Sequence, residues 1–200
     1  MFVLALTGGI ASGKSTALRY LIERSEGHVS IFDCDLEVAR LYDSGRLNEA
    51  LCENFGAGAV TQEGKVDRTF LRERVFADPK ERERLERMIH PVLRQECLAK
   101  IDAVRHDPSV TGFVIDIPLF YETGMDCGQD AVCVVATSLP TQKMRLARRN
   151  GFDEDMIDSI LAAQLPMDVK LRKADIVLWN EGPESLLLRQ TECLYQHYFR

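Results

Sequence analysis

The stretch FVLALTGGIASGKS, residues 2–15, decides the fold of this chain. An apolar run is followed by one threonine and then by a glycine-rich loop of the form G-x-x-x-x-G-K-S. A helical pattern begins at Ser15 and continues to Arg24. A buried strand, a glycine-rich turn and a helix in this order are typical of a loop that holds phosphate groups.

The residue types in this loop explain the chemistry expected of it. Glycines let backbone N–H groups turn toward phosphate oxygens, and the helix start adds the positive end of a dipole. Lys14 is expected to reach the β- and γ-phosphates of a nucleotide, and the Ser15 hydroxyl to ligate Mg²⁺. The alternative is an ordinary glycine-rich turn. We assign the binding of nucleotide phosphates to Gly8, Gly9, Ile10, Ala11, Ser12, Gly13, Lys14, Ser15 and Thr16.

Composition excludes several other classes of function. The 200 residues carry a formal net charge of −6 at pH 7, which makes the chain a poor general binder of nucleic acid. Six cysteines occur without a C-x-x-C pair, which fits a reducing compartment. No apolar run approaches the ~20 residues of a membrane span, and no signal peptide is expected. We expect a cytoplasmic protein without a nucleic-acid, membrane or protein partner.

Four further apolar segments accompany the first and predict a five-stranded parallel sheet. Helical patterns alternate with the strands, so we expect an α/β fold with right-handed crossovers. A last helix is expected over Pro183–Tyr198. The five predicted strands are Phe2–Leu6, Val29–Phe32, Phe113–Ile117, Ala131–Ala136 and Ile176–Leu178.

Two helical insertions divide the predicted sheet. Residues 36–110 are expected to form a helical subdomain for the acceptor, and residues 140–173, rich in Arg and Lys, a lid. The nucleotide-binding core is then 1–35, 111–139 and 174–200. The first insertion contains helical patterns over Leu36–Tyr42, Arg46–Phe55, Arg68–Phe76 and Lys80–Val104, the last of which we expect to kink or restart at Pro91.

Acidic residues follow the second strand and lie within the third. Asp33 and Asp35 share one side of an extended chain, and either carboxylate could accept a proton from an attacking hydroxyl or hold Mg²⁺ through water. Since Asp is also a favoured N-cap, we expect one of the two to be functional and the other structural. Asp116 is either a Walker-B-like carboxylate or a buried polar residue bonded to the loop.

Basic and polar residues follow the last two strands. The lid carries Arg145, Arg148 and Arg149, of which at least one is expected to reach the transferred phosphoryl group; a solvated basic face is the alternative. Asn180, in WNEG, is either a contact to a purine base or an ordinary turn residue. No N-K-x-D guanine motif occurs, so a GTPase is disfavoured. A lid and an acceptor subdomain favour a small-molecule kinase.

These residues taken singly do not identify the acceptor, but the chain resembles the dephospho-CoA kinase family along nearly its whole length. D-x-D-x-x-A-R, a mid-chain His-Pro and P-L-[LF]-[FY]-E are the more specific motifs. Cys34, where the family more often has Ala, and the order Phe120-Tyr121 are mild departures. The matching stretches are ALTGGIASGKST (5–16), DCDLEVAR (33–40), GKVDRTFLRERVF (64–76), LERMIHPVL (85–93), IDIPLFYE (115–122), RLARRNGF (145–152), AAQLPMDVKLRKAD (162–175) and WNEG (179–182).

The resemblance implies a P-loop kinase-like three-layer fold and transfer of the γ-phosphoryl group of ATP, with Mg²⁺, to the ribose 3′-hydroxyl of dephospho-CoA. Asp35 is then similar to the base or orienting carboxylate, Arg149 to the lid arginine, and Arg145 and Asn180 to ATP contacts. The acceptor side implied by the resemblance comprises Asp33, Arg40, His90, Pro118, Leu119, Phe120 and Glu122. His90 could instead be a capping or core histidine. Gln164 and Lys170 also match family positions, without an assigned role.

Two other classes of function stay open on the sequence alone. A nucleoside or nucleotide kinase could use the same parts, and it would phosphorylate a nucleoside faster than dephospho-CoA. A non-catalytic nucleotide-binding switch would bind ATP without turnover that depends on an acceptor. Lys14, Ser15 and Asp35, all present, argue against the switch.

Overall fold

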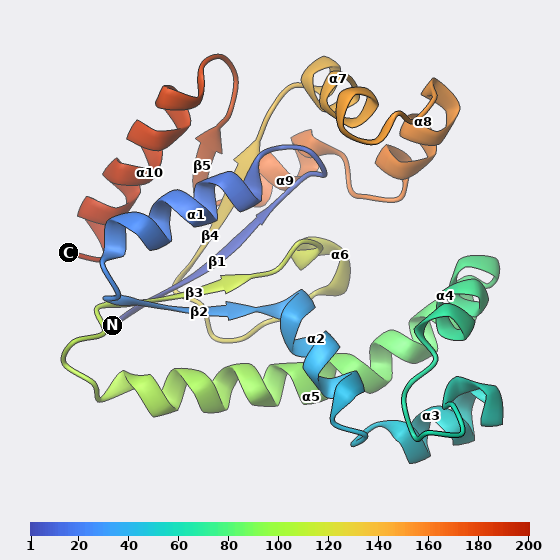
Figure 1. The fold of residues 1–200 in the computed structure, drawn as a ribbon. Helices are drawn as coiled ribbons and strands as arrows, with labels where there is room; N and C mark the ends of the chain where they lie inside the picture. Colours follow the sequence, from blue (N-terminus) through green and yellow to red (C-terminus); the bar gives the residue numbers. More distant parts are fainter. The chain divides into compact units, whose positions relative to one another are not determined.

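The computed structural model describes residues 1–200 except for the side chain of Asn150. Five strands form one parallel sheet in the order β2-β3-β1-β4-β5 (Figure 1). The prediction of a five-stranded parallel α/β fold is confirmed, and each strand lies within two residues of its predicted bounds. The strands are β1 (Phe2–Gly8), β2 (Val29–Asp33), β3 (Gly112–Asp116), β4 (Ala131–Ala136) and β5 (Ile176–Trp179).

The helices also follow the predicted patterns, with differences at their ends. Six of them correspond to predicted helical segments: α1 (Lys14–Ser25), α2 (Cys34–Asp43), α3 (Asn48–Phe55), α4 (Arg68–Ala77), α5 (Pro79–Arg105) and α10 (Glu184–Tyr198). The segment predicted as a helical lid contains α7 (Leu139–Asn150), α8 (Glu154–Ala162) and α9 (Met167–Lys173). Two short elements were not predicted: α6 (Phe120–Thr123) and the 3₁₀ turn Ala57–Ala59.

Two details of local structure differ from the expectations. Helix α5 does not restart at Pro91, since it continues without a break from Pro79 to Arg105, and a kink at Pro91 stays a prediction. Proline removes one N–H donor there, but the other backbone hydrogen bonds of so long a helix remain. The third strand ends at Asp116 rather than at Ile117. The residue before a proline is restricted, and Pro118 follows Ile117 directly.

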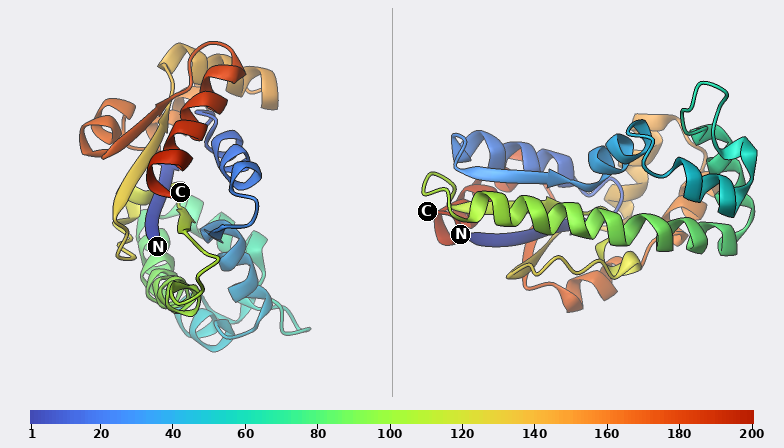
Figure 2. Two further views of the ribbon diagram at one scale, coloured as in Figure 1. Left: turned by 90° about the vertical axis from the view of Figure 1, so that its left-hand side faces the viewer. Right: turned by 90° about the horizontal axis from the view of Figure 1, so that it is seen from below.

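The described residues form two compact units. The first comprises residues 1–32 and 100–200 and contains the sheet, whereas the second comprises residues 33–99 and is helical. In the first unit, α1 and α10 cover one face of the sheet and α9 lies on the other (Figure 2). Among the described residues, no helix has the length and apolarity that a membrane crossing requires.

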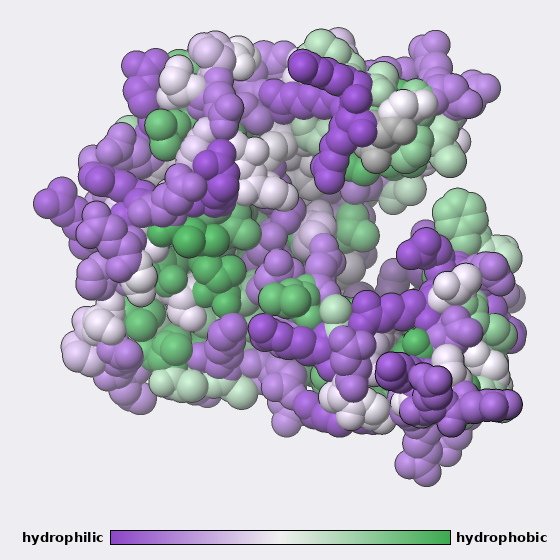
Figure 3. Space-filling view, viewed as in Figure 1, coloured by the Kyte–Doolittle hydropathy of each residue, from purple (hydrophilic) through white to green (hydrophobic). Residues whose placement is uncertain are grey.

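The core of the first unit lies between the sheet and the helix pair α1 and α10. Leu4, Leu6, Val114 and Val135 point to this face and are at most 1% exposed. Alternate residues of the same strands are buried on the opposite face, as expected for a parallel sheet covered on both sides. Each buried aliphatic side chain contributes about 1.5–3 kcal/mol. Some apolar surface remains exposed between α1 and β2, drawn in green in Figure 3.

Candidate active site

The glycine-rich loop lies between the end of β1 and the start of α1, as the sequence predicts. Gly13 has φ 97°, and a Cβ at this residue would lie 2.1 Å from the Asn180 Nδ2 atom, so only glycine fits. None of the described side chains caps α1, and its first turn carries no acidic residue. The N–H groups of this turn therefore present positive charge to an anion at the carboxyl end of β1.

Three consecutive carbonyl groups of the loop accept hydrogen bonds from side chains outside it. Gln142 Nε2 donates to the Ile10 oxygen at 2.7 Å. Arg145 donates to the Ala11 oxygen at 3.1 Å and to the Ser12 oxygen at 3.3 Å. Asn180 Nδ2 also donates to the Ser12 oxygen, at 2.8 Å. Because the negative ends of these peptide dipoles are held by outside donors, the loop is suited to an anion.

Lys14 forms an ion pair with Asp116 at the end of β3. The Asp116 residue is only 7% exposed, so its carboxylate lies in a poorly hydrated place beside the loop. The structure thus brings Asp116 to Lys14, the lysine that the sequence predicts to bind phosphate. Ser15, in the first turn of α1, is exposed, and its hydroxyl is therefore accessible to a metal ion.

Arg145 and Asn180 act on the loop backbone in this structure. Arg145 also donates to the Asn180 backbone oxygen at 3.2 Å, which links α7 to the loop after β5. Asn180 is 8% exposed, and the sequence offered no sign that its amide would hold Ser12. Direct contacts of these two residues to ATP stay a prediction. Arg149, near the end of α7, is exposed.

Glu181 fastens the start of α7 to the loop after β5. Its carboxylate accepts hydrogen bonds from the Ser138 N–H at 3.0 Å, from the Thr137 hydroxyl at 2.6 Å and from the Thr141 hydroxyl at 2.5 Å. The backbone N–H of Ser138, followed by the two hydroxyls, lowers the pKa of Glu181 to about 2. Glu181 is therefore charged throughout the neutral range, and this anchor was not foreseen from the sequence.

Glu122 contacts a lysine rather than open solvent. Its Oε1 atom lies 2.8 Å from the Lys170 ammonium and accepts a hydrogen bond from the Leu165 N–H at 2.9 Å. The Lys170 side chain is 0% exposed. Of the other predicted acceptor residues here, Phe120 is buried against Tyr121, the Pro118 oxygen accepts from the Thr7 hydroxyl, and Leu119 is 36% exposed.

We expect Lys170→Met to lower the free energy of unfolding by about 3–5 kcal/mol, because it leaves the largely buried Glu122 carboxylate without its counter-charge. The double variant Glu122→Gln/Lys170→Met should recover most of this loss, since an uncharged pair needs no counter-charge. Urea denaturation followed by circular dichroism measures both changes. Equal losses in the single and the double variant would contradict the ion pair.

In the second unit, the two aspartates after β2 differ in environment. Asp33 is the N-cap of α2, and its Oδ1 atom accepts from the Leu36 N–H at 2.9 Å. Asp35, in the first turn of α2, is exposed. It lines a hollow of about 270 Å³ together with Val38, Ala39, Tyr42, Arg68, Leu71, Arg72, Val75 and Leu85.

This hollow brings together residues that the sequence analysis did not single out. Arg68 lies over the Tyr42 ring, 5.6 Å from its centroid, and donates to Asp43 at 2.8 Å. Arg68 and Arg72 are four residues apart on α4, a spacing that places both on one face and could have been noticed. Arg40 and His90 do not line the hollow. Arg40 instead pairs with Glu37 at 2.6 Å on the exposed side of α2.

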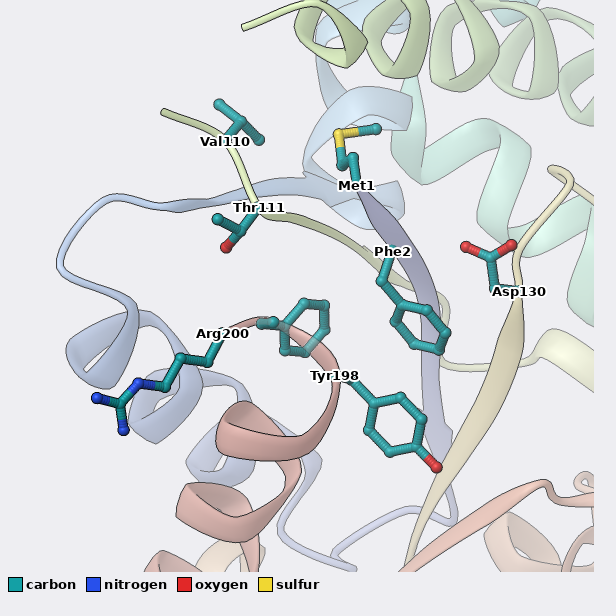
Figure 4. A pocket seen from close by; sticks show the side chains of 8 residues that line it. Met1, Phe2, Val110, Thr111, Asp130, Tyr198 and Arg200 are labelled. Carbon is teal, nitrogen blue, oxygen red and sulfur yellow. The ribbon is translucent and has the colours of Figure 1, made fainter. Parts of the chain in front are cut away.

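A second hollow, of about 630 Å³, lies at the amino ends of the strands (Figure 4). Phe2 and Tyr198 stack along one wall with ring centroids 4.8 Å apart. Arg200 points away from Asp130, as Figure 4 shows. Ligands of open α/β sheets bind beyond the carboxyl ends of the strands, so we place the active site at the glycine-rich loop.

A glycine-rich loop of this motif that joins the first strand of a parallel sheet to its first helix is typical of P-loop nucleotide-binding proteins, and the five-stranded parallel sheet with its helices gives this chain a P-loop kinase-like fold. The family model described as "Dephospho-CoA kinase" matches residues 2–185. The chain therefore belongs to the dephospho-CoA kinase family, and it is an ATP-dependent phosphotransferase.

Individual relatives agree with this assignment. A dephospho-CoA kinase of Symbiobacterium thermophilum is 37% identical over 199 residues, which cover 98% of this chain and 81% of the relative. A solved structure from Thermus thermophilus is 29% identical with a TM-score of 0.76, covering 98% of this chain and 97% of the other. A dephospho-CoA kinase structure from Campylobacter jejuni has the same fold, with 23% identity, a TM-score of 0.64 and the same coverage.

Proposed function

We propose that this protein transfers the γ-phosphoryl group of ATP to the ribose 3′-hydroxyl of dephospho-CoA, giving coenzyme A and ADP. The observation that carries the proposal is the loop of residues 8–15, in which Lys14 and the first-turn N–H groups of α1 form an anion site while the carbonyls are held from outside. The family match over residues 2–185 supports the acceptor.

On the ATP side, we assign the β- and γ-phosphates to Lys14 and to the N–H groups at the start of α1. The Ser15 hydroxyl is a suitable protein ligand for Mg²⁺, which usually keeps few protein ligands beside the phosphates of the nucleotide. Bound there, Mg²⁺ would neutralise charge on the β- and γ-oxygens. The segment α7–α9 acts as a lid in this proposal, with Arg149 free to face the transferred group.

On the acceptor side, we assign proton removal or orientation of the attacking hydroxyl to Asp35. The hollow beside it combines the apolar walls of Val38 and Leu71 with Arg68 and Arg72. Such a lining suits a molecule with an apolar stretch and phosphate groups, because guanidinium groups bind phosphates bidentately. None of the six cysteines, all of which the structure describes, forms a disulfide, in agreement with the reducing cytoplasm that we propose as the location.

An ADP-release assay with a panel of acceptors tests the function. We expect ADP to form only when ATP, a divalent metal ion and dephospho-CoA are all present, and AMP and adenosine to be poor substitutes. Turnover with adenosine equal to that with dephospho-CoA would replace the proposal with a nucleoside kinase. ATP binding without turnover for any acceptor would indicate a non-catalytic switch.

A further inference from the structure

Two glutamines hold a single residue of the phosphate loop, one through its N–H group and the other through its carbonyl oxygen. The Ile10 N–H donates to Gln164 Oε1 at 3.0 Å, and the Ile10 oxygen accepts from Gln142 Nε2 at 2.7 Å. Gln142 belongs to α7, and Gln164 to the turn between α8 and α9. The loop residue Ile10 is thus hydrogen-bonded to two places in the α7–α9 segment, the first turn of α7 and the turn before α9.

The residue after Ile10 has a backbone conformation that must be stabilised by its surroundings. Ala11 has φ 58°, in the left-handed region that residues with a Cβ seldom adopt. Such a conformation persists only where the surroundings over-determine it. The two glutamine contacts lie immediately before Ala11, and Arg145 holds the Ala11 oxygen. Losing the Gln164 contact would therefore release the loop at its most strained point.

Gln164 is in turn placed by the buried ion pair Glu122–Lys170. The neighbouring Leu165 N–H donates to Glu122 Oε1, the same oxygen that lies 2.8 Å from the Lys170 ammonium. The Lys170 side chain is 0% exposed, and its contact with Glu122 links it to the turn of residues 164–166. One ion pair, Lys170–Glu122, and two hydrogen bonds, Leu165 to Glu122 and Ile10 to Gln164, therefore connect α9 to the phosphate loop within the first unit.

We propose that Gln164 is a positioning residue for ATP, because it holds residues Ile10 and Ala11 of the loop in the conformation that binds phosphate. The Glu122–Lys170 ion pair in turn fixes the position of Gln164. The inference rests on the proposed function only as far as ATP is a substrate, and not on the identity of the acceptor. This role explains why a glutamine and a buried lysine accompany the loop. Neither side chain needs to touch the acceptor.

Gln164→Leu tests the proposal, with Gln129→Leu as a matched control. Gln129 accepts a backbone hydrogen bond of the same length, 3.0 Å from the Cys127 N–H, in the loop before β4. We expect Gln164→Leu to raise the Kd for ATP about tenfold, because one backbone residue must then be ordered on binding. Calorimetry without the acceptor measures this Kd. The KM for ATP should rise in parallel, while the KM for the acceptor stays within about twofold. Gln129→Leu should leave both unchanged.

Hydrogen exchange of the Ile10 amide, followed by NMR, supplies a second readout. The exchange of this amide should accelerate in Gln164→Leu and stay slow in Gln129→Leu, because only the first variant removes its acceptor. If Gln164→Leu does not fold, Gln164→Asn, one methylene shorter, replaces it with the same expectations. An unchanged ATP Kd, or an equal change in the control, would overturn the proposal. A wild type that binds ATP but ignores dephospho-CoA would refute only the proposed acceptor.

Discussion

Lys14→Ala is expected to lower kcat by about 10³-fold, the scale for removing a group that stabilises charge in the transition state. Lys14 is the only cationic residue among residues 8–16 of the loop. Without it, the loop itself offers no side-chain charge to balance the negative charge that develops on the transferred phosphoryl group. The ADP-release assay measures this effect directly.

A matched control separates the effect from a general loss of a lysine. Lys65→Ala removes an ammonium from the exposed pair with Glu63, whose atoms are 3.9 Å apart, and should leave kcat unchanged. The Lys14 variant also leaves Asp116 without this cation in a buried place, so its Tm must be measured alongside. Near-normal turnover of a folded Lys14→Ala protein would refute the phosphate-loop assignment.

Asp35→Asn is expected to leave ATP binding nearly intact and to lower kcat by about 10²-fold, the usual contribution of a positioned base. The substitution keeps the shape of the side chain and removes its charge. Asp35 is exposed and lines the hollow that we assign to the acceptor, so its carboxylate is accessible to a substrate hydroxyl. Calorimetry with ATP and steady-state kinetics measure the two quantities on the same sample.

Asp33 supplies the comparison for this experiment. As the N-cap of α2 it contributes to helix stability, and Asp33→Ala should lower the free energy of unfolding by about 1 kcal/mol. Asp33→Asn should keep the cap, because asparagine caps helices as well as aspartate does. Normal turnover of Asp35→Asn together with an inactive Asp33→Asn would show that the two roles are reversed.

The sheet was predictable because its strands are short apolar runs between turn residues, and burial on both faces leaves this pattern in the sequence. Helix α6 was missed because four residues after Pro118 carry no periodicity that could reveal them. The continuity of α5 through Pro91 excludes the restart that the sequence left open beside a kink. Proline is a strong local signal, and here the rest of a 27-residue helix overrides it.

The glycine-rich loop itself could be found from its motif, but its supports could not. Gln142, Gln164 and Asn180 reach the loop from positions more than 130 residues away in the chain. Polar side chains of this kind look like surface residues until the fold supplies their partners. The burial of Lys170 was the hardest feature to predict. Lysine is rarely buried without a partner, and the sequence around Lys170 does not indicate that Glu122 is that partner.

The hydrogen bonds that Gln142, Arg145 and Asn180 donate to the loop carbonyls also favour the binding of small tetrahedral anions. A loop shaped before its ligand arrives has little conformational freedom left to lose on binding, so even a small ligand can occupy it. Inorganic phosphate, pyrophosphate and sulfate offer the same oxygen geometry as the end of a nucleotide. They should therefore compete with ATP, and the choice of buffer becomes part of the measured affinity.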